Sequence, residues 1–200
     1  MRTLPILFLF FINVCFTQTG IPEINTRVYG NYREISSSLS GSACSLACVM
    51  KWTLSATSIL SDNGTTSYKT ENMKDGLPNT AWAEGAEGYG IGEKIYVRID
   101  GNNKANNVSF WGIRIANGFQ KDSTTWKDNS RVKYLRVYHN SKPILIINLE
   151  DKMGVQAAKW KPNLIRLNNN DLIAFEIIGI YKGDKNENTA ISDLVLDGAH

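Results

Sequence analysis

The chain has 200 residues, of which 42% are hydrophobic and 10% aromatic, a composition typical of one packed globular domain. This length is too short for two enzymatic domains, and the aromatic content argues against a disordered chain. The 22 basic and 19 acidic residues give a net charge of +3 and are dispersed along the sequence, whereas a nucleic-acid-binding protein would need a clustered basic surface.

The N-terminus has the features of an export signal. Arg2 supplies a positive start, an apolar run covers residues 4–16, and the chain turns polar at residues 17–20. The run is too short to cross a bilayer as a helix, so we expect no transmembrane segment. We therefore predict a signal peptide at residues 1–18 and a secreted or extracytoplasmic protein. An acylated Cys15 is the alternative, disfavoured because no small residue precedes Cys15 at the expected positions.

Residues 19–48 are rich in serine and contain few large apolar side chains, which predicts a leader or spacer ahead of a domain at residues 49–200. If Cys15 leaves with the signal, Cys44 and Cys48 remain as an even pair in an oxidising compartment. This predicts a disulfide between them. A metal pair is the alternative, weakened because no second Cys or His pair follows at zinc spacing.

Downstream of the turn-rich residues 75–93, short strands separated by turn signals are predicted. Apolar and polar residues alternate at 94–99, as in a strand with one buried face. Further strands are predicted at residues 108–115, 131–138, 144–149, 164–167, 171–181 and 190–196. The periodicity of residues 173–180 is compatible with either a strand or a short buried helix. Their β-branched side chains favour a strand. Without a convincing long amphipathic helix, the pattern predicts an all-β fold, an antiparallel β-sandwich.

Residues 75–93, with the sequence DGLPNTAWAEGAEGYGIGE, combine turn formers, a tryptophan and carboxylates ahead of a strand. The side-chain oxygens of Asp75 and Thr80, with backbone carbonyls near Lys74 and Asn79, are candidate ligands for one hard cation, usually Ca²⁺. A polar turn is the alternative. The glycines lead into a strand, not from a strand into a helix, so this is not a dinucleotide-binding loop.

The same residues carry a family resemblance. The patterns D-G-x-x-x-T-A-W and E-G-x-x-G-x-G-I-G-E resemble discoidin-like domains of coagulation-factor type C. The resemblance is closer to their bacterial branch, the NADase-type glycan-binding domain or NAD glycohydrolase translocation domain. Residues 115–138 and 181–198 agree with it, so it covers the chain from about residue 52 onward. The chain departs from the family pattern at Asp193, where a glutamate is expected, and upstream of Trp52.

The resemblance implies a jelly roll of the galactose-binding type, with Trp82 packed into its core. It also implies that Asp193 completes the Ca²⁺ site, although its side chain is one methylene shorter than the expected glutamate. The NAD glycohydrolase activity of the family belongs to a separate catalytic domain, for which this chain is too short.

The polar loop at residues 121–129 surrounds Trp126 without a nearby apolar partner, which predicts an exposed platform for stacking on a sugar. Core packing is the alternative for Trp126. Tyr89 is expected to supply a second aromatic face if the two loops meet at one end of the sandwich. The expected groups for sugar hydroxyls are Asp128, Asn129 and Arg131.

Catalysis finds little support in the sequence. His139 and His200 are not in an obvious base–nucleophile context. Glu84, Glu87 and Glu93 are candidates for a catalytic carboxylate pair; the alternative is that Glu93 caps or pairs at a strand start and the others are solvated. We expect a secreted, non-catalytic carbohydrate-binding module with a structural Ca²⁺, whose partner is a glycan or cell-surface carbohydrate. A protein–protein or surface-adhesion module on the same fold is the alternative.

Overall fold

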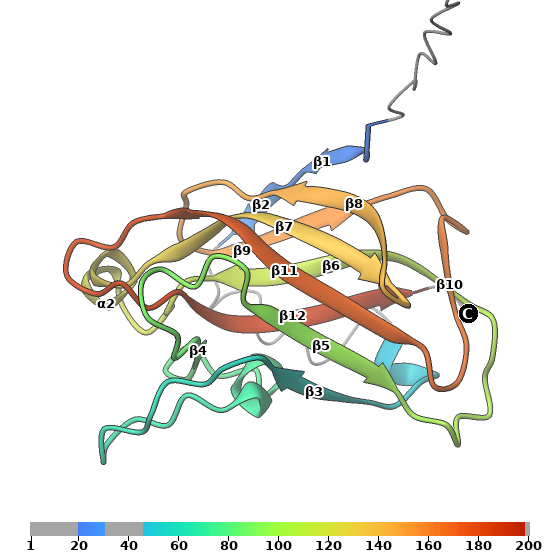
Figure 1. The fold of residues 1–200 in the computed structure, drawn as a ribbon, viewed down its shortest axis with the longest axis horizontal. Coiled ribbons are helices and arrows are strands. Elements are labelled where there is room, and N and C mark those ends of the chain that lie inside the picture. Colours follow the sequence, from blue (N-terminus) through green and yellow to red (C-terminus); the bar gives the residue numbers. More distant parts are fainter. Residues whose placement is uncertain (1–19, 31–45, 199–200) are drawn as a thin grey trace, which may run out of the picture.

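The computed structural model describes residues 20–30 and 46–198, which form a β-sandwich (Figure 1). The predicted signal peptide, Cys15 and Cys44 lie outside the described residues, so export and the Cys44–Cys48 pairing stay predictions. Cys48 is described and is disulfide-bonded. Within the described ranges, no helix is both long enough and apolar enough to cross a membrane.

Two sheets make up the sandwich. The first contains, in spatial order, β1 (Glu23–Asn25), β8 (Lys142–Asn148), β7 (Arg131–His139), β11 (Leu172–Tyr181), β5 (Lys94–Ile99) and β3 (Trp52–Ala56). The second contains β2 (Arg27–Gly30), β9 (Val155–Lys159), β6 (Val108–Asn117), β12 (Ala190–Gly198) and β4 (Trp82–Ala83), with β10 (Ile165–Leu167) also paired to β6. Three short helical turns complete the described fold: η1 (Leu46–Cys48), η2 (Thr70–Lys74) and α2 (Ser123–Asp128). The predicted antiparallel β-sandwich is confirmed, with the parallel β1–β8 pair as an addition.

The core lies between the two sheets, and strand alternation explains which side chains fill it. In β5, Ile95, Val97 and Ile99 are at most 1% exposed, whereas Arg98 points outward and is exposed. Trp82 is fully buried in the same core, and its Nε1 donates to the Ser58 carbonyl at 3.2 Å. The expectation that Trp82 is a core residue is confirmed.

The predicted strands are present with small shifts of their ends. Residues 173–180, which periodicity left open to a helix, lie within β11, paired with β5 on one side and β7 on the other. The turn between β7 and β8 is formed by Asn140 and Ser141, with φ values of 47° and 69°. Two consecutive positive φ values are typical of a type I′ turn, which matches the twist of the strands that it connects. β9, which was not predicted, has a Gln-Ala-Ala sequence that lacks both β-branched residues and alternation.

The prediction that residues 19–48 form a spacer outside the domain is wrong for residues 23–30. β1 extends the first sheet beside β8, and β2 extends the second sheet beside β9. Thr26, between these strands, is 4% exposed, and its hydroxyl lies 2.7 Å from Gln156 Oε1. Composition did not reveal these strands, because strands of three or four residues are stabilised by their neighbours and not by their own sequence.

Candidate ligand-binding site

Three connections gather at the end of the sandwich that carries α2 (Figure 1). They are residues 84–93 between β4 and β5, residues 118–130 between β6 and β7, and residues 182–189 between β11 and β12. We call these three connections the loop end. Because strands of the two sheets fix both ends of each connection, side chains on them are held in defined positions.

Glu84 joins the first of these connections to the third. Its carboxylate is fully buried and accepts the backbone N–H of Ala86 at 2.8 Å and that of Thr189 at 3.0 Å. Gly90, at φ 70°, passes so close that a Cβ there would lie 2.5 Å from Glu84 Cγ. The Thr189 hydroxyl also donates to the Tyr89 carbonyl at 2.9 Å. These hydrogen bonds therefore hold the glycine-rich connection against residues 182–189, and they place the Tyr89 backbone beside that segment.

Burial raises the pKa of Glu84 above its ordinary value of 4.5, and the N–H groups of Thr189 and Ala86 partly offset this effect. A raised pKa in the folded state means that folding favours the neutral carboxyl. The resulting contribution to stability is fully present below pH 4.5 and is lost as the pH rises through the raised value.

Replacing Glu84 with glutamine tests this assignment, because glutamine does not titrate. Between pH 4.5 and neutrality, the free energy of unfolding should decline with pH less in the variant than in the wild type. The free energy of unfolding of the variant should also be lower by about 1–3 kcal/mol, because its amide NH₂ faces a backbone N–H donor. Urea unfolding across this pH range measures both effects. The control is Glu87→Gln, an exposed position in the same connection; parallel profiles for Glu84→Gln and the wild type would contradict the raised pKa.

α2 was not predicted, and a side-chain cap explains its start. The Asp122 carboxylate accepts the Thr125 N–H at 2.7 Å, and this hydrogen bond lowers the pKa of Asp122. The six-residue helix ends at Asp128 and turns the chain back toward β7. An amphipathic pattern cannot be recognised over so few residues. The sequence of residues 121–129 therefore predicts a polar loop and not a helix.

The predicted ligand residues Asp128 and Asn129 lie at the loop end, and they hold α2 to the β11–β12 connection. The Asp128 carbonyl accepts the N–H groups of Lys185 at 3.2 Å and Asn186 at 2.8 Å. The Asp128 carboxylate also pairs with the Lys185 ammonium at 3.0 Å. Asn129 Oδ1 accepts from the Asn186 side chain at 3.2 Å. These contacts make Asp128 and Asn129 part of the framework of the loop end.

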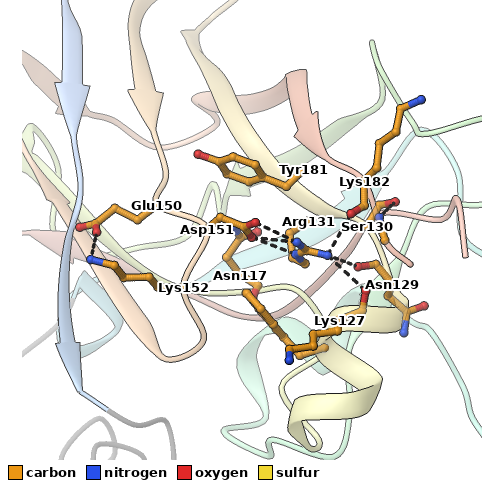
Figure 2. Close-up of polar contacts among 12 residues, drawn as sticks. Asn117, Lys127, Asn129, Ser130, Arg131, Glu150, Asp151, Lys152, Tyr181 and Lys182 are labelled. Carbon is orange, nitrogen blue, oxygen red and sulfur yellow. Dashed lines mark hydrogen bonds and ion pairs between the residues drawn. The ribbon is translucent and has the colours of Figure 1, made fainter. Parts of the chain in front are cut away.

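Arg131, a third predicted ligand residue, is buried at 6% exposure and is surrounded by acceptors (Figure 2). Its Nη2 lies 2.9 Å from both carboxylate oxygens of Asp151. Its Nη1 donates to the carbonyls of Lys127 (3.3 Å), Asn129 (3.0 Å) and Lys182 (3.2 Å). The guanidinium thereby ties together α2, the β8–β9 connection and the end of β11. This geometry assigns Arg131 a structural role and corrects the expectation that it faces a sugar.

The prediction that Trp126 is an exposed stacking platform is wrong. The side chain is 8% exposed, its Nε1 donates to the Asn117 carbonyl at 2.9 Å, and the Arg131 guanidinium lies 4.5 Å from the ring centre. Gly118 makes room for the indole, since a Cβ there would lie 2.8 Å from two ring atoms. The partners of Trp126 therefore lie on the chain just outside residues 121–129, and the sequence of that segment alone does not reveal them.

Tyr89, the remaining predicted residue, is half-buried at the loop end, with the exposed Lys182 ammonium 4.5 Å from its ring centre. Asn188 donates to the Glu84 carbonyl at 3.1 Å through Nδ2. Among the described residues, no hydrogen bond uses the Oδ1 of Asn186 or of Asn188. The Tyr89 ring thus lies against the Lys182 ammonium, and the two free amide oxygens belong to the same connection as Lys182. The sequence analysis did not predict Lys182, Asn186 and Asn188 as site residues. Their polar segment between two strands, KGDKNEN, was a usable signal.

The carboxylates of the glycine-rich connection do not form a pair over an open site. Glu84 is buried with its two backbone donors, whereas Glu93 accepts from the Thr57 hydroxyl at 2.6 Å and from the Ser58 hydroxyl. His139 lies at the far end of β7, with its Nε2 2.8 Å from Asp171 Oδ2.

The predicted cation ligands come from neighbouring elements. The Thr80 hydroxyl lies 2.8 and 3.0 Å from the two carboxylate oxygens of Asp75. Asp193 is buried on β12 at 4% exposure, and η2, which directly precedes Asp75, packs against that strand. All three side chains offer oxygen, the donor type that a hard cation such as Ca²⁺ takes.

Comparison with known proteins places this fold in a family. A family model described as the NAD glycohydrolase translocation F5/8 type C domain matches residues 47–197, which confirms the resemblance inferred from the motifs. The match begins after β1 and β2, so these two strands are additions to the matched region. A comparison with curated proteins found no match.

Solved structures with the same fold include sugar-binding modules. The CBM32-1 and CBM32-2 domains of Clostridium perfringens ZmpB align with 92% of this chain and 43% of theirs, at 13% identity and a TM-score of 0.62. The same domains in complex with GalNAc align with 89% of this chain and 40% of theirs, at 12% identity and a TM-score of 0.61. This chain therefore spans less than half the length of those chains. At such low identity the similarity establishes the fold.

Proposed function

This chain belongs to the NAD glycohydrolase translocation F5/8 type C domain family, and we propose that it is a non-catalytic carbohydrate-binding module whose ligand contacts the loop end. The observation that carries the proposal is the half-buried Tyr89 ring, which lies 4.5 Å from the Lys182 ammonium at the loop end, where Asn186 and Asn188 also have free amide oxygens. A sugar ring presents C–H groups to an aromatic face and hydroxyls to donors and acceptors around it. The GalNAc complex of the ZmpB domains, which share this fold, supports a sugar as the ligand.

The absence of catalysis is part of the same proposal. It is supported by the hydrogen bonds of two carboxylates: Glu84 is fully buried with two backbone N–H donors, and Glu93 accepts the hydroxyls of Thr57 and Ser58. A glycosidase needs two carboxylates that flank the bond to be broken, and the buried Glu84 cannot supply one of them.

Replacing Tyr89 with alanine is expected to weaken glycan binding about tenfold or more. The estimate takes stacking as about 1–3 kcal/mol, by analogy with bases on aromatic rings. The melting temperature should change little, because the Tyr89 backbone, and not its ring, is held by Thr189. A glycan array followed by titration of the best ligand provides the measurement. Tyr29→Ala is the matched control, since Tyr29 is 60% exposed on β2, outside the loop end. Equal loss of binding in both variants would contradict the site.

A structural Ca²⁺ at Asp75, Thr80 and Asp193 is a further part of the proposal. At about a hundredfold excess over its dissociation constant, the ion would stabilise the native state by about 2.7 kcal/mol. Melting in Ca²⁺ and in chelator should then differ by several degrees, and Asp75→Asn should abolish the difference. Identical melting curves in the wild type, with no metal by elemental analysis, would remove the ion from the proposal.

A protein partner at the loop end is the second candidate function, favoured by the family description, which refers to translocation. The exposed Asp184, Lys185 and Glu187 offer charged groups suited to such a contact. The glycan array separates the two candidates: a sugar hit that depends on Tyr89 supports carbohydrate binding. If no glycan on the array binds and a protein is captured through residues 184–187, the result supports adhesion.

A further inference from the structure

β10 lies at the opposite end of the sandwich from α2 and the loop end (Figure 1). A pocket of about 610 Å³ has Arg166 of β10 in its lining. Its walls come from the β5–β6 connection, the β9–β10 connection and β10 itself, with Val49 at one side. This volume is in the range of small-molecule sites. The lining includes apolar groups, such as Val108 and Pro162, and a polar set formed by Asn106, Asn107, Ser109, Asn163 and Arg166.

Arg166 is the charged side chain of this lining, and two asparagines fix its position. Its Nε donates to Asn107 Oδ1 at 2.6 Å, its Nη2 to the Asn107 carbonyl, and its Nη1 to Asn163 Oδ1. Both asparagines have positive φ, 55° for Asn107 and 70° for Asn163, and asparagine tolerates this conformation. A guanidinium has five N–H donors, so these three contacts leave one donor on each terminal nitrogen.

The asparagines of the pocket also present donors and not acceptors. The Oδ1 atoms of Asn107 and Asn163 accept from Arg166, and Asn106 Oδ1 accepts the Asn169 N–H at 3.1 Å. Each of these oxygens accepts from a donor, and this fixes the orientation of the side-chain amide. The NH₂ group of each amide therefore points away from that donor. Among the described residues, no hydrogen bond uses the Nδ2 of Asn106, Asn107 or Asn163. The Ser109 hydroxyl accepts the Asn163 N–H at 3.2 Å, so, in the part of the structure that is described, its own O–H is also a free donor. The free side-chain polar groups of the pocket are therefore the amide and guanidinium N–H groups and this O–H.

The charge of Arg166 has no partner of opposite sign: in the described part of the chain, no carboxylate lies within ion-pair distance of it. A fixed guanidinium with two donors free, surrounded by amide donors, matches a planar anion with two oxygens. We propose that this pocket binds the carboxylate of an acidic sugar, a hexuronate, with the sugar ring against the apolar wall at Val108 and Pro162. This is a second site, independent of the ligand bound at the loop end.

Titration of the isotope-labelled protein with glucuronate, followed by NMR, tests the proposal. Glucuronate should shift the side-chain amide signals of Asn106, Asn107 and Asn163. Glucose, which has the same ring without the charge, should bind at least about tenfold more weakly. Inorganic sulfate should also bind at least about tenfold more weakly, because it has no sugar ring to pack against Val108 and Pro162.

Two variants place the binding in this pocket. Arg166→Gln removes the charge, and Asn107→Asp keeps the acceptors for Arg166 while adding a carboxylate that neutralises it. Each should weaken glucuronate binding at least about tenfold. Lys161→Gln, an exposed cation beside the pocket but outside its lining, should bind like the wild type, and so should Tyr89→Ala at the loop end. Both pocket variants should melt cooperatively, because Arg166 is exposed.

Three results would overturn the assignment: unchanged glucuronate affinity in both pocket variants, equal affinity for glucose or sulfate, or glucuronate shifts confined to the loop end. None of them counts against carbohydrate binding at Tyr89, so the two proposals fail separately.

Discussion

Trp126→Ala is expected to lower the free energy of unfolding by about 3–5 kcal/mol, the usual cost of deleting a buried aromatic side chain. The indole is 8% exposed, donates to the Asn117 carbonyl and stacks under Arg131. Its removal leaves a cavity beside Gly118, takes one of two side-chain donors from the Asn117 carbonyl, which keeps Gln120 Nε2 at 2.7 Å, and leaves a guanidinium without its aromatic neighbour. Chemical denaturation followed by circular dichroism measures the loss.

Trp126→Phe is the matched control, since it keeps an aromatic ring under Arg131 and loses the Nε1 donor; it should cost less than the alanine variant. Glycan affinity of the folded fraction should be unchanged in both variants. A stable Trp126→Ala protein that has lost its ligand would restore Trp126 as a binding platform and place the ring outside the core.

Arg131→Met should be the second strongly destabilising change, by about 2–4 kcal/mol. The substitution keeps much of the aliphatic stem but leaves the Lys127, Asn129 and Lys182 carbonyls without their shared donor. Asp151 is 38% exposed in its side chain and regains water, so the lost ion pair contributes less than the three carbonyls do. Thermal and urea unfolding provide the measurement.

Two further variants separate these contributions. Asp151→Asn should cost about 1 kcal/mol, because it removes one charge and keeps an acceptor for Arg131. Arg136→Met, on the same strand and outer face of the first sheet, should cost less than Arg131→Met because its side chain is 35% exposed. If Asp151→Asn destabilises as much as Arg131→Met, the ion pair and not the carbonyl contacts holds α2 to the sheet.

The strands that the sequence predicted correctly share one property. β5, β6, β7 and β11 carry alternating or continuous β-branched residues, and their burial follows from that local pattern. β3 was missed although its sequence WTLSA alternates apolar and polar residues. The other missed strands lack the pattern: β9 contains two alanines and a glutamine that its neighbours bury, and β1 and β2 are too short for any period to be seen. The strands β1, β2 and β9 depend on pairing with β8, β9 and β6 respectively, which lie far away in the sequence.

The sequence by itself determined the all-β fold, the family motifs around Trp82, and the position of Tyr89 in a glycine-rich segment ahead of a strand. Only the tertiary structure decided which aromatic side chains of the loops are exposed. Trp126 has polar neighbours in sequence, yet its contacts come from Asn117, Gly118 and Arg131, which the fold brings around it. Burial is a property of the surrounding chain and not of adjacent residues, so residues 121–129 could not show it.

The second proposed site, at Arg166, also depends on contacts that only the folded chain creates. The pocket at Arg166 is built from residues 105–109 and 162–166, which meet because β10 pairs with β6. The hydrogen bonds from Arg166 and from the Asn169 N–H occupy the side-chain oxygens of the three asparagines, and this determines which donors remain for a ligand. A sequence specifies the amides, but only the folded chain determines which end of each amide faces the pocket.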